Sequence, residues 1–450
     1  MKQYYSLTEE NMEHLHELVS QNAVMVSTII LIVAYIFIAW EKISKVTIAL
    51  LGGSLTLFLG LLATEKTHEN LAQYFISFVD FNVIFLLVSM MIVVHIAAQS
   101  GMFTWLANEI LKKTKGKPKM VLVALAVFTA VASAFLDNVT TVILVMPITF
   151  AACKLLDINP IPFLITEIFC SNIGGTATLI GDPPNIIIGS AAGLSFMDFV
   201  RELTLPVCFI MLVVVTLMVF IYRKDLKSSP EKMELVSKID NSGTITDKKL
   251  AIRAGIVLGL VVLGFVTHDI THIPTFLVAM MGAAFLMIFE KPEKILVEVE
   301  WNTIFFFVGL FIIIGGFEHA GGIEIMANWL LEVTKGSQEA TSMLILWASG
   351  ILSGIIDNIP YTATMAPMIA SIETIKGTDY VTPLWWSLAL GACLGGNMTM
   401  IGAAANVIVT ENAHKAGHKI SFMYFLKYGI IVTMISLAIS TVYVYLRYLK

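Results

Sequence analysis

Residues 133–141 read SAFLDNVTT, and residues 353–361 read SGIIDNIPY. Each stretch places an Asp-Asn pair near the middle of a long apolar segment, 120–156 in the first half and 340–375 in the second. A complete crossing of a bilayer needs about 20 apolar residues, so neither segment is long enough for two crossings. We therefore predict two re-entrant hairpins, each with two half-length arms that meet at a polar tip.

A second pair of motifs interrupts two other apolar segments. Residues 174–185 read GGTATLIGDPPN, and residues 395–406 read GGNMTMIGAAAN. Gly and Pro at this density end a helix, and unwound backbone inside a membrane must line protein or a watery cavity. The segments 162–192 and 383–412 are therefore predicted to be broken helices.

The motifs recur in the same order at a nearly constant offset. Asp137 matches Asp357 and, with one residue more, Asn185 matches Asn406. Each copy holds an odd number of predicted crossings, so the second copy must be inverted in the membrane, as in transporters that alternate access to a midplane site. We predict an N-terminal repeat over residues 1–222, a cytoplasmic linker over 223–249 and a C-terminal inverted repeat over 250–450.

The composition points to lipid as the solvent. Of the 450 residues, 57% are hydrophobic and only 14% are charged, whereas about 25% are charged in a typical soluble domain. The chain is therefore predicted to be an all-α polytopic membrane protein with about ten transmembrane helices. The complete spans are expected near 24–41, 46–63, 82–99, 203–222, 250–267, 273–289, 302–318 and 423–447.

The distribution of charge orients these spans. Most of the 28 Lys and Arg residues lie in the linker 223–249 and in loops predicted on one side. By the positive-inside rule that side is cytoplasmic. This predicts a multi-pass protein of the inner (plasma) membrane with both termini outside, the first hairpin entering from the cytoplasm and the second from outside. The acidic head before residue 23 has no cleavage site, so the first span is expected to be retained. The amphipathic stretches 102–115 and 322–335 are expected to lie in the interface.

Several classes of function are disfavoured by missing motifs. The four cysteines show no metal-binding spacing. The sequence contains no P-loop, no HExxH and no GxSxG. We therefore expect no enzyme activity, no ATP hydrolysis and no bound cofactor. The expected partners are lipid and a small inorganic ion or small anion, with no nucleic acid.

The hairpin tips and helix breaks should converge on one site. Asn and Thr offer neutral oxygens and Asp offers charge, a ligand set that suits a hard cation such as Na⁺. Helix N-termini at the same places could instead hold an anion, and both interpretations stay open. The candidate ion- or substrate-binding residues are Asp137, Asn138, Thr140, Asn172, Gly175, Thr178, Asp182, Asn185, Asp357, Asn358, Thr362, Asn397, Thr399 and Asn406.

The acidic residues among them have two possible roles. Asp137 and Asp357 could cap the second hairpin arms, but a carboxylate deep in a membrane is costly and is functional by default. Asp182 could bind an ion or shape the turn before two prolines. Glu167 is a candidate proton carrier, or could bond within the bundle. A Na⁺ site is expected at Asp137, Asn138, Asp357 and Asn358.

At these motifs the sequence resembles the ion-transporter superfamily. Its members include bacterial arsenite permeases, the melanosomal (pink-eyed-dilution) P proteins, NhaD-type sodium/proton antiporters and sodium-coupled divalent-anion symporters. The resemblance covers residues 24–447 and is most like the arsenite-permease and P-protein branch. It implies a homodimer in which the hairpins and broken helices move as an elevator against fixed helices. It also implies one ion site in each half, at Asp137, Asn138, Thr178 and Asn185 and at Asp357, Asn358, Thr399 and Asn406.

Charge decides between the possible transport reactions. Two buried carboxylates, with no Lys or Arg expected near the motifs, favour cation/proton exchange, because Na⁺ and a proton would compete for one group. We therefore predict a secondary active transporter, most simply a Na⁺/H⁺ antiporter, coupled to Na⁺ or H⁺. The alternative is an ion-coupled anion transporter for arsenite efflux or for a dicarboxylate or citrate-like substrate, and a cation at the site would favour it.

Overall fold

A computed structural model describes residues 21–40, 42–63 and 71–450. These residues form helices and no strands, which confirms the all-α prediction. The acidic head, Lys2 and Lys66 lie outside the described residues. The first half contains α2 Ala23–Trp40, α3 Lys45–Ala63, α4 Leu71–Phe78, α5 Phe81–Gln99, α6 Met102–Lys113, α7 Pro118–Ser133, α8 Asn138–Leu156, α9 Ile161–Gly175, α10 Pro183–Ala192, α11 Phe196–Ile221 and α12 Pro230–Ser237.

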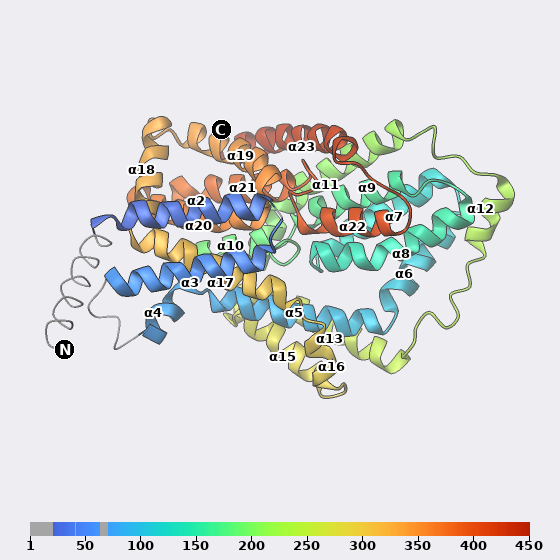
Figure 1. Cartoon of the computed structure of the whole chain (residues 1–450). Helices are drawn as coiled ribbons and strands as arrows, with labels where there is room; N and C mark the ends of the chain where they lie inside the picture. Colours follow the sequence, from blue (N-terminus) through green and yellow to red (C-terminus); the bar gives the residue numbers. More distant parts are fainter. Residues whose placement is uncertain (1–20, 41, 64–70) are drawn as a thin grey trace.

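The second half continues with a similar order of elements (Figure 1). It contains α13 Lys248–Val266, α14 His268–Thr271, α15 Thr275–Met287, α16 Pro292–Val297, α17 Trp301–His319, α18 Gly322–Val333, α19 Gln338–Ile356, α20 Asn358–Lys376, α21 Thr378–Gly395, α22 Ala404–Lys415, α23 Phe422–Val444 and the π-helix η1 Tyr445–Leu449. Within the described ranges, eight helices are long and apolar enough to cross a membrane, and shorter apolar helices accompany them. The polytopic prediction is therefore confirmed.

The helices pack into two groups. We call α2, α3, α5, α13, α15 and α17 the scaffold group, in which α3 packs along α17 and α15 along α5. We call α7–α11 and α19–α23 the hairpin group, in which α19 packs along α21, α7 along α9, and α20 against both α10 and α21. Helix α6 contacts α5 and α8, and α18 contacts α17 and α20, so each links the two groups. In Figure 1, α12 and α18 lie at opposite ends of the molecule.

A small residue brings the two central scaffold helices together. A Cβ on Gly309 of α17 would lie 2.5 Å from the backbone carbonyl of Ala49 on α3. Close approach at small residues is how helices associate in lipid, where the hydrophobic effect between helices is lost. The interface between α3 and α17 therefore depends on a glycine at this position.

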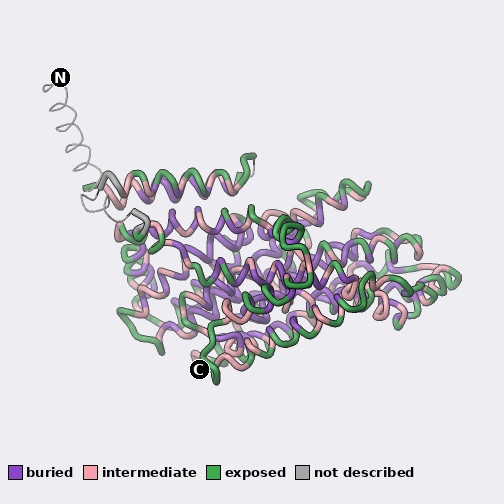
Figure 2. Tube along the Cα trace, turned by 90° about the horizontal axis from the view of Figure 1, so that it is seen from below, coloured by how far each residue is buried: buried purple, intermediate pink, exposed green. Residues whose placement is uncertain are grey.

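The two hairpins have longer arms than we predicted. Helices α7 and α8 contain 16 and 19 residues, and α19 and α20 contain 19 each. The tips are short, so most of each hairpin segment is helical. Residues 134–137 separate the first pair of helices, and Asp357 alone separates the second pair. The helices that lead into the two breaks, α9 and α21, are buried along almost their whole length. Figure 2 shows buried chain concentrated in the middle of the molecule.

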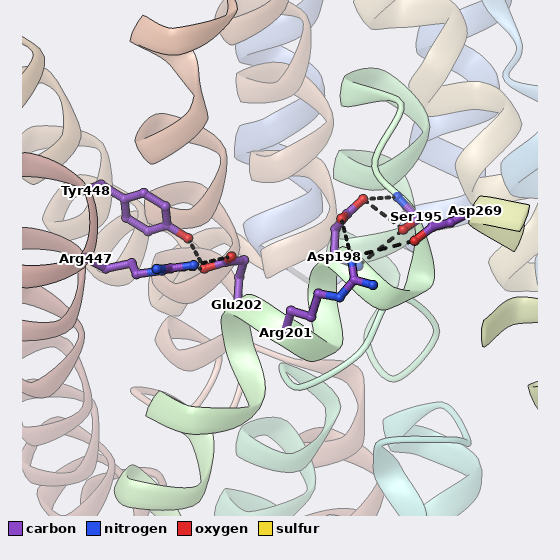
Figure 3. Close-up of polar contacts among 7 residues, drawn as sticks. All are labelled: Ser195, Asp198, Arg201, Glu202, Asp269, Arg447 and Tyr448. Atoms are coloured by element: carbon purple, nitrogen blue, oxygen red, sulfur yellow. Dashed lines mark hydrogen bonds and ion pairs between the residues drawn. The ribbon is translucent and has the colours of Figure 1, made fainter. Parts of the chain in front are cut away.

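The start of α11 is fixed by polar contacts (Figure 3). Ser195 and Asp198 form a capping box, which starts this helix at Phe196, before the predicted residue 203. Glu202 accepts hydrogen bonds from Arg447 at 3.0 and 3.1 Å and from Tyr448, so η1 is tied to α11. The short helices α4, α12, α14 and α16 were also missed. In α12 the local signals are clear, since Ser229 caps the helix and Pro230 occupies its first turn.

Candidate functional site

Both tip aspartates cap the second arm of their hairpin. Asp137 accepts a hydrogen bond from the Thr140 backbone N–H at 2.8 Å, and Asp357 accepts one from the Ile359 N–H at 3.1 Å. Capping leaves the second carboxylate oxygen of each residue available for another contact. The capping role is therefore present at both tips and is compatible with an additional role in ion binding.

The matching asparagines after the breaks hold the unwound chain. Asn185 donates to the carbonyls of Thr176 and Thr178 at 3.1 and 2.8 Å. Asn406 donates to the carbonyls of Gly396 and Thr399 at 2.7 and 2.8 Å. These bonds satisfy carbonyls that the helix breaks leave without intrahelical partners. Each amide thus stabilises the loop of its own break.

Side chains from the two breaks meet at the centre of the hairpin group. Asn172 donates to Asn397 Oδ1 at 2.9 Å and to Asn406 Oδ1 at 3.0 Å. Cys393 lies at the matching position in the second half, and its thiol donates to Asn185 Oδ1 at 3.4 Å. These residues are buried, so two sets of buried polar contacts join the halves of the chain at the breaks.

Asp182 connects a break to the opposite hairpin. Its side chain is 1% exposed, and the Asn358 amide lies 3.3 Å from both of its carboxylate oxygens. A buried carboxylate needs a proton, a counter-ion or several hydrogen bonds. The side chains of Cys393 and Asn138 also lie against this carboxylate. All of these partners are neutral, so a proton or cation that reaches Asp182 from the cavity would still be needed to neutralise its charge.

A cavity of about 280 Å³ lies between the scaffold group and the hairpin group. Its hairpin side carries four of the predicted site residues, Asp137, Asn138, Asp182 and Asn358. The scaffold side is formed by Lys45, Leu87, Met91, Glu300, Thr303 and Phe306. Sites for drug-sized ligands occupy about 300–1,000 Å³, so this cavity suits an ion or a small solute.

Other predicted residues serve the backbone around the cavity. Thr178 bonds the Ala134 carbonyl, Thr362 donates to Asn358 O at 2.8 Å, and Thr399 donates to Gly354 O at 2.6 Å. Among the described residues, those that line the cavity do not include Thr140, Asn172, Gly175, Thr178, Asn185, Asp357, Thr362, Asn397, Thr399 or Asn406, although Asp357 is paired with Lys45, which does line it.

Glu167 lies on α9, away from the cavity lining. It is buried, and it accepts a hydrogen bond from the Thr149 hydroxyl of α8 at 2.5 Å. This contact fits the interpretation of Glu167 as a residue bonded within the bundle.

The prediction that no Lys or Arg lies near the motifs is wrong. Lys45 lines the cavity, and its ammonium lies 2.8 Å from Asp357 Oδ2. The residue was missed because it stands at the first position of an apolar helix far from the motifs in sequence. Glu300 was missed as well. It follows Asp80, the capping residue of α5, by the same number of residues as Asp357 follows Asp137, so it is the matching position in the second half. Burial and the nearby Asp137 carboxylate raise the pKa of Glu300 above its ordinary value.

The charged groups that line the cavity are mostly acidic. Asp137, Asp182 and Glu300 face one base, Lys45, among the described residues that line it. In the described part of the chain, no group of three or more His, Cys, Asp or Glu side chains could hold a metal ion together. The N-terminus of α22 also reaches the cavity through Ala403, Ala404 and Ala405, and a helix N-terminus attracts anions.

Comparison with known proteins gives the context for this site. The sequence profile of the citrate transporter family matches residues 35–391. An uncharacterized transporter of Mycobacterium tuberculosis is 40% identical, over 94% of this chain and 98% of that protein. A 46 kDa membrane protein of Mycobacterium leprae is also 40% identical, over 94% and 99%. The human P protein is 30% identical over 94% of this chain but 60% of its own length.

A solved structure shows a similar fold. The YdaH transporter of Alcanivorax borkumensis superposes with a TM-score of 0.57 over 91% of this chain and 97% of that chain, at 13% sequence identity. Identity this low supports the fold alone. The citrate-transporter profile and the similarity to P proteins confirm the predicted resemblance to the ion-transporter superfamily.

Proposed function

The chain belongs to the citrate transporter family and is a membrane transporter rather than an enzyme, and we propose that it exchanges Na⁺ for protons by alternating access. The observation that carries this proposal is the acidic cavity between the scaffold and hairpin groups. Its three lining carboxylates exceed the single ammonium of Lys45, so the cavity needs protons or cations to become neutral.

Exchange follows from competition for the same carboxylates. Ionised carboxylates crowded in a low-dielectric site repel one another, and a proton or a cation relieves that repulsion. Asp137 and Asp182 lie on the hairpin group and would travel with the bound ion, whereas Glu300 lies on the scaffold side. A site that is loaded with either Na⁺ or protons, but rarely with both, couples the two fluxes in opposite directions.

The proposal also covers the movement, symmetry and oligomeric state that were expected from the sequence. We propose that the hairpin group moves as an elevator against the scaffold group, that the two halves are inverted repeats, and that the protein is a homodimer of the inner membrane. Helix α17 packs less extensively against α20, and α5 against α10, than helices pack inside each group. This weaker packing between the groups supports relative movement.

The experiment uses purified protein in liposomes with a trapped pH dye. Pulses of NaCl, LiCl and KCl are compared with pulses of arsenite, succinate and citrate. We expect Na⁺ or Li⁺ to drive protons across the membrane, and we expect Asp137→Asn and Asp357→Asn to lose this response. A dye signal that requires one of the anions, with no response to the cations alone, would contradict the proposed exchange.

Ion-coupled anion transport is the second candidate. Lys45 and the N-terminus of α22 both reach the cavity, and the family description names citrate. In that case Lys45 would contact the anion and the aspartates would bind the coupling ion. The excess of carboxylates over bases in the cavity makes this candidate weaker than cation exchange, because a polyanion would meet net negative charge.

A further inference from the structure

The two hairpin tips differ in backbone conformation although their sequences match. Asp137 has φ −65° and ψ 156°, an ordinary extended capping conformation. Asp357 has φ 106° and ψ 137°, a region that residues with a side chain rarely adopt. Such strain persists only where surrounding contacts impose it. A contact that exists at the second tip alone should therefore explain the difference.

The ion pair with Lys45 is the contact that involves the Asp357 side chain itself. The ammonium lies 2.8 Å from Asp357 Oδ2, and the aspartate side chain is 7% exposed while that of Lys45 is 37% exposed. The same ammonium lies 5.4 Å from the centre of the Phe306 ring on α17, within the range of a cation–π interaction. The scaffold group thus holds Lys45 in place, and Lys45 holds the tip of the second hairpin.

The ammonium occupies a position that an entering cation would need. Lys45 faces Asp357 on the hairpin group and Glu300 on the scaffold side, and Asp182 contacts Asn358, the neighbour of Asp357. An ammonium bound to a carboxylate neutralises it as a metal cation would, but it cannot leave with the hairpin because it is covalently part of α3.

We propose that Lys45 is an internal cation of the second hairpin site, and that a transported cation must displace its ammonium from Asp357. This inference rests on the proposed cation exchange. Displacement removes the ion pair that joins Asp357 to the scaffold group and lets Asp357 relax toward the conformation of Asp137. The hydrogen bond from Tyr35 of α2 to the Pro360 carbonyl remains. The unloaded hairpin stays tethered through Lys45, so movement without a cation is disfavoured.

The first test measures cation affinity from the Na⁺ dependence of exchange in liposomes. In Lys45→Met no ammonium competes for Asp357, so we expect half-saturation at a Na⁺ concentration roughly tenfold lower than in the wild type, the size of effect that one neighbouring charge has on a proton equilibrium. Lys45→Arg keeps the charge and should retain weak binding. Lys42→Met is the matched control, since Lys42 lies over the Trp40 ring.

The second test uses the wild-type protein and does not depend on a variant that folds. An amine-reactive acylating reagent labels Lys45 and Lys42, and mass spectrometry follows each rate in NaCl and in N-methylglucamine chloride of equal ionic strength. We expect Na⁺ to accelerate labelling of Lys45 and to leave labelling of Lys42 unchanged.

The outcomes separate this inference from the proposed function. Wild-type exchange with the same Na⁺ affinity in Lys45→Met overturns the inference alone. Lys45 labelling that ignores Na⁺ also overturns it, whether or not exchange is seen. Absence of any cation/proton exchange in the wild type overturns the proposed function, while Na⁺-dependent labelling of Lys45 would still support displacement.

Discussion

At the scale of single residues, close backbone approach sets which side chains fit around the first tip. A Cβ on Gly175 would lie 2.5 Å from Asn138 Oδ1 and 2.7 Å from the Gly181 carbonyl. The Asn138 side chain cannot retreat easily because it also contacts Ser133 and Ser171, and the Gly181 carbonyl belongs to the backbone of the break. The glycine therefore permits the packing of the break against the tip.

We expect Gly175→Ala to lower the free energy of unfolding by about 1–3 kcal/mol, the usual cost of overpacking. Thermal unfolding in detergent measures the change. Gly259→Ala is the matched control, since a Cβ there meets nothing within 4 Å. Equal stability of the two variants would show that the break can move away from the tip.

Two buried acids that the sequence analysis proposed for ion or proton binding, Asp182 and Glu167, have different surroundings in the structure. Asp182 lines the cavity and Glu167 does not. Because Glu167 is bonded to Thr149, we expect Glu167→Gln to retain Na⁺/H⁺ exchange, whereas Asp182→Asn should lose most of it. Initial rates in liposomes compare the two variants at matched protein content. Loss of coupling in Glu167→Gln with coupling intact in Asp182→Asn would move the proton site from the cavity to α9.

At the scale of elements, the central linker is anchored to α6. Asn241 donates to the Trp105 carbonyl and to Glu109 Oε1, both at 2.9 Å, and accepts from Asn108 at 3.1 Å. Hydrogen bonds from Asn241 and Lys112 lower the pKa of Glu109. These contacts fasten the linker to a helix that joins the scaffold group to the hairpin group.

We expect Asn241→Ala to remove about 1–3 kcal/mol of local stability, because it leaves polar partners of the amide unsatisfied. The linker should then be cut faster by a protease added to the detergent-solubilised protein. Ser242→Ala is the control in the same linker, since Ser242 is exposed and bonds its near neighbour Asp240. Equal cleavage of both variants would contradict the anchoring role of Asn241.

The elements also show what sequence reasoning can and cannot reach. Apolar length and the Gly- and Pro-rich motifs identified most of the helices and both breaks, because those signals are local. Apolar length was less reliable for single spans: α8 and α19 were expected to be half-length arms but are long enough to cross a membrane, whereas the predicted span 273–289 corresponds to a shorter apolar helix. The partners of the tips could not be predicted in this way: Lys45 lies on α3 and Glu300 precedes α17, and only packing brings them to the cavity. Glu300 could have been found from the repeat, because Asp80 and Glu300 are separated by the same number of residues as Asp137 and Asp357.

At the scale of the whole molecule, the two matching scaffold acids have different surroundings. Asp80 bonds Ser190 of α10, while Glu300 faces the cavity beside Asp137. In an inverted arrangement these acids mark opposite ends of the path. The contact of Asp80 with Ser190 joins the scaffold group to the hairpin group, whereas Glu300 accepts a hydrogen bond from Thr303 of α17, within the scaffold group.

Alternating access then requires the contact between Asp80 and Ser190 to open. In the double variant Asp80→Cys/Ser190→Cys, we expect oxidation to form a disulfide that stops transport, and reduction to restore it. Each single cysteine variant controls for the loss of the native side chain. Full exchange by the oxidised double variant would show that α5 and α10 need not separate.

The most direct test of cation/proton exchange follows ²²Na⁺ and protons together in the same liposomes, with no transportable anion present. An outward Na⁺ gradient should drive protons inward, an imposed acid interior should drive ²²Na⁺ inward, and both fluxes should vanish together in Asp182→Asn. Movement of ²²Na⁺ that requires citrate or another anion travelling in the same direction would contradict exchange and establish this transporter as an anion symporter.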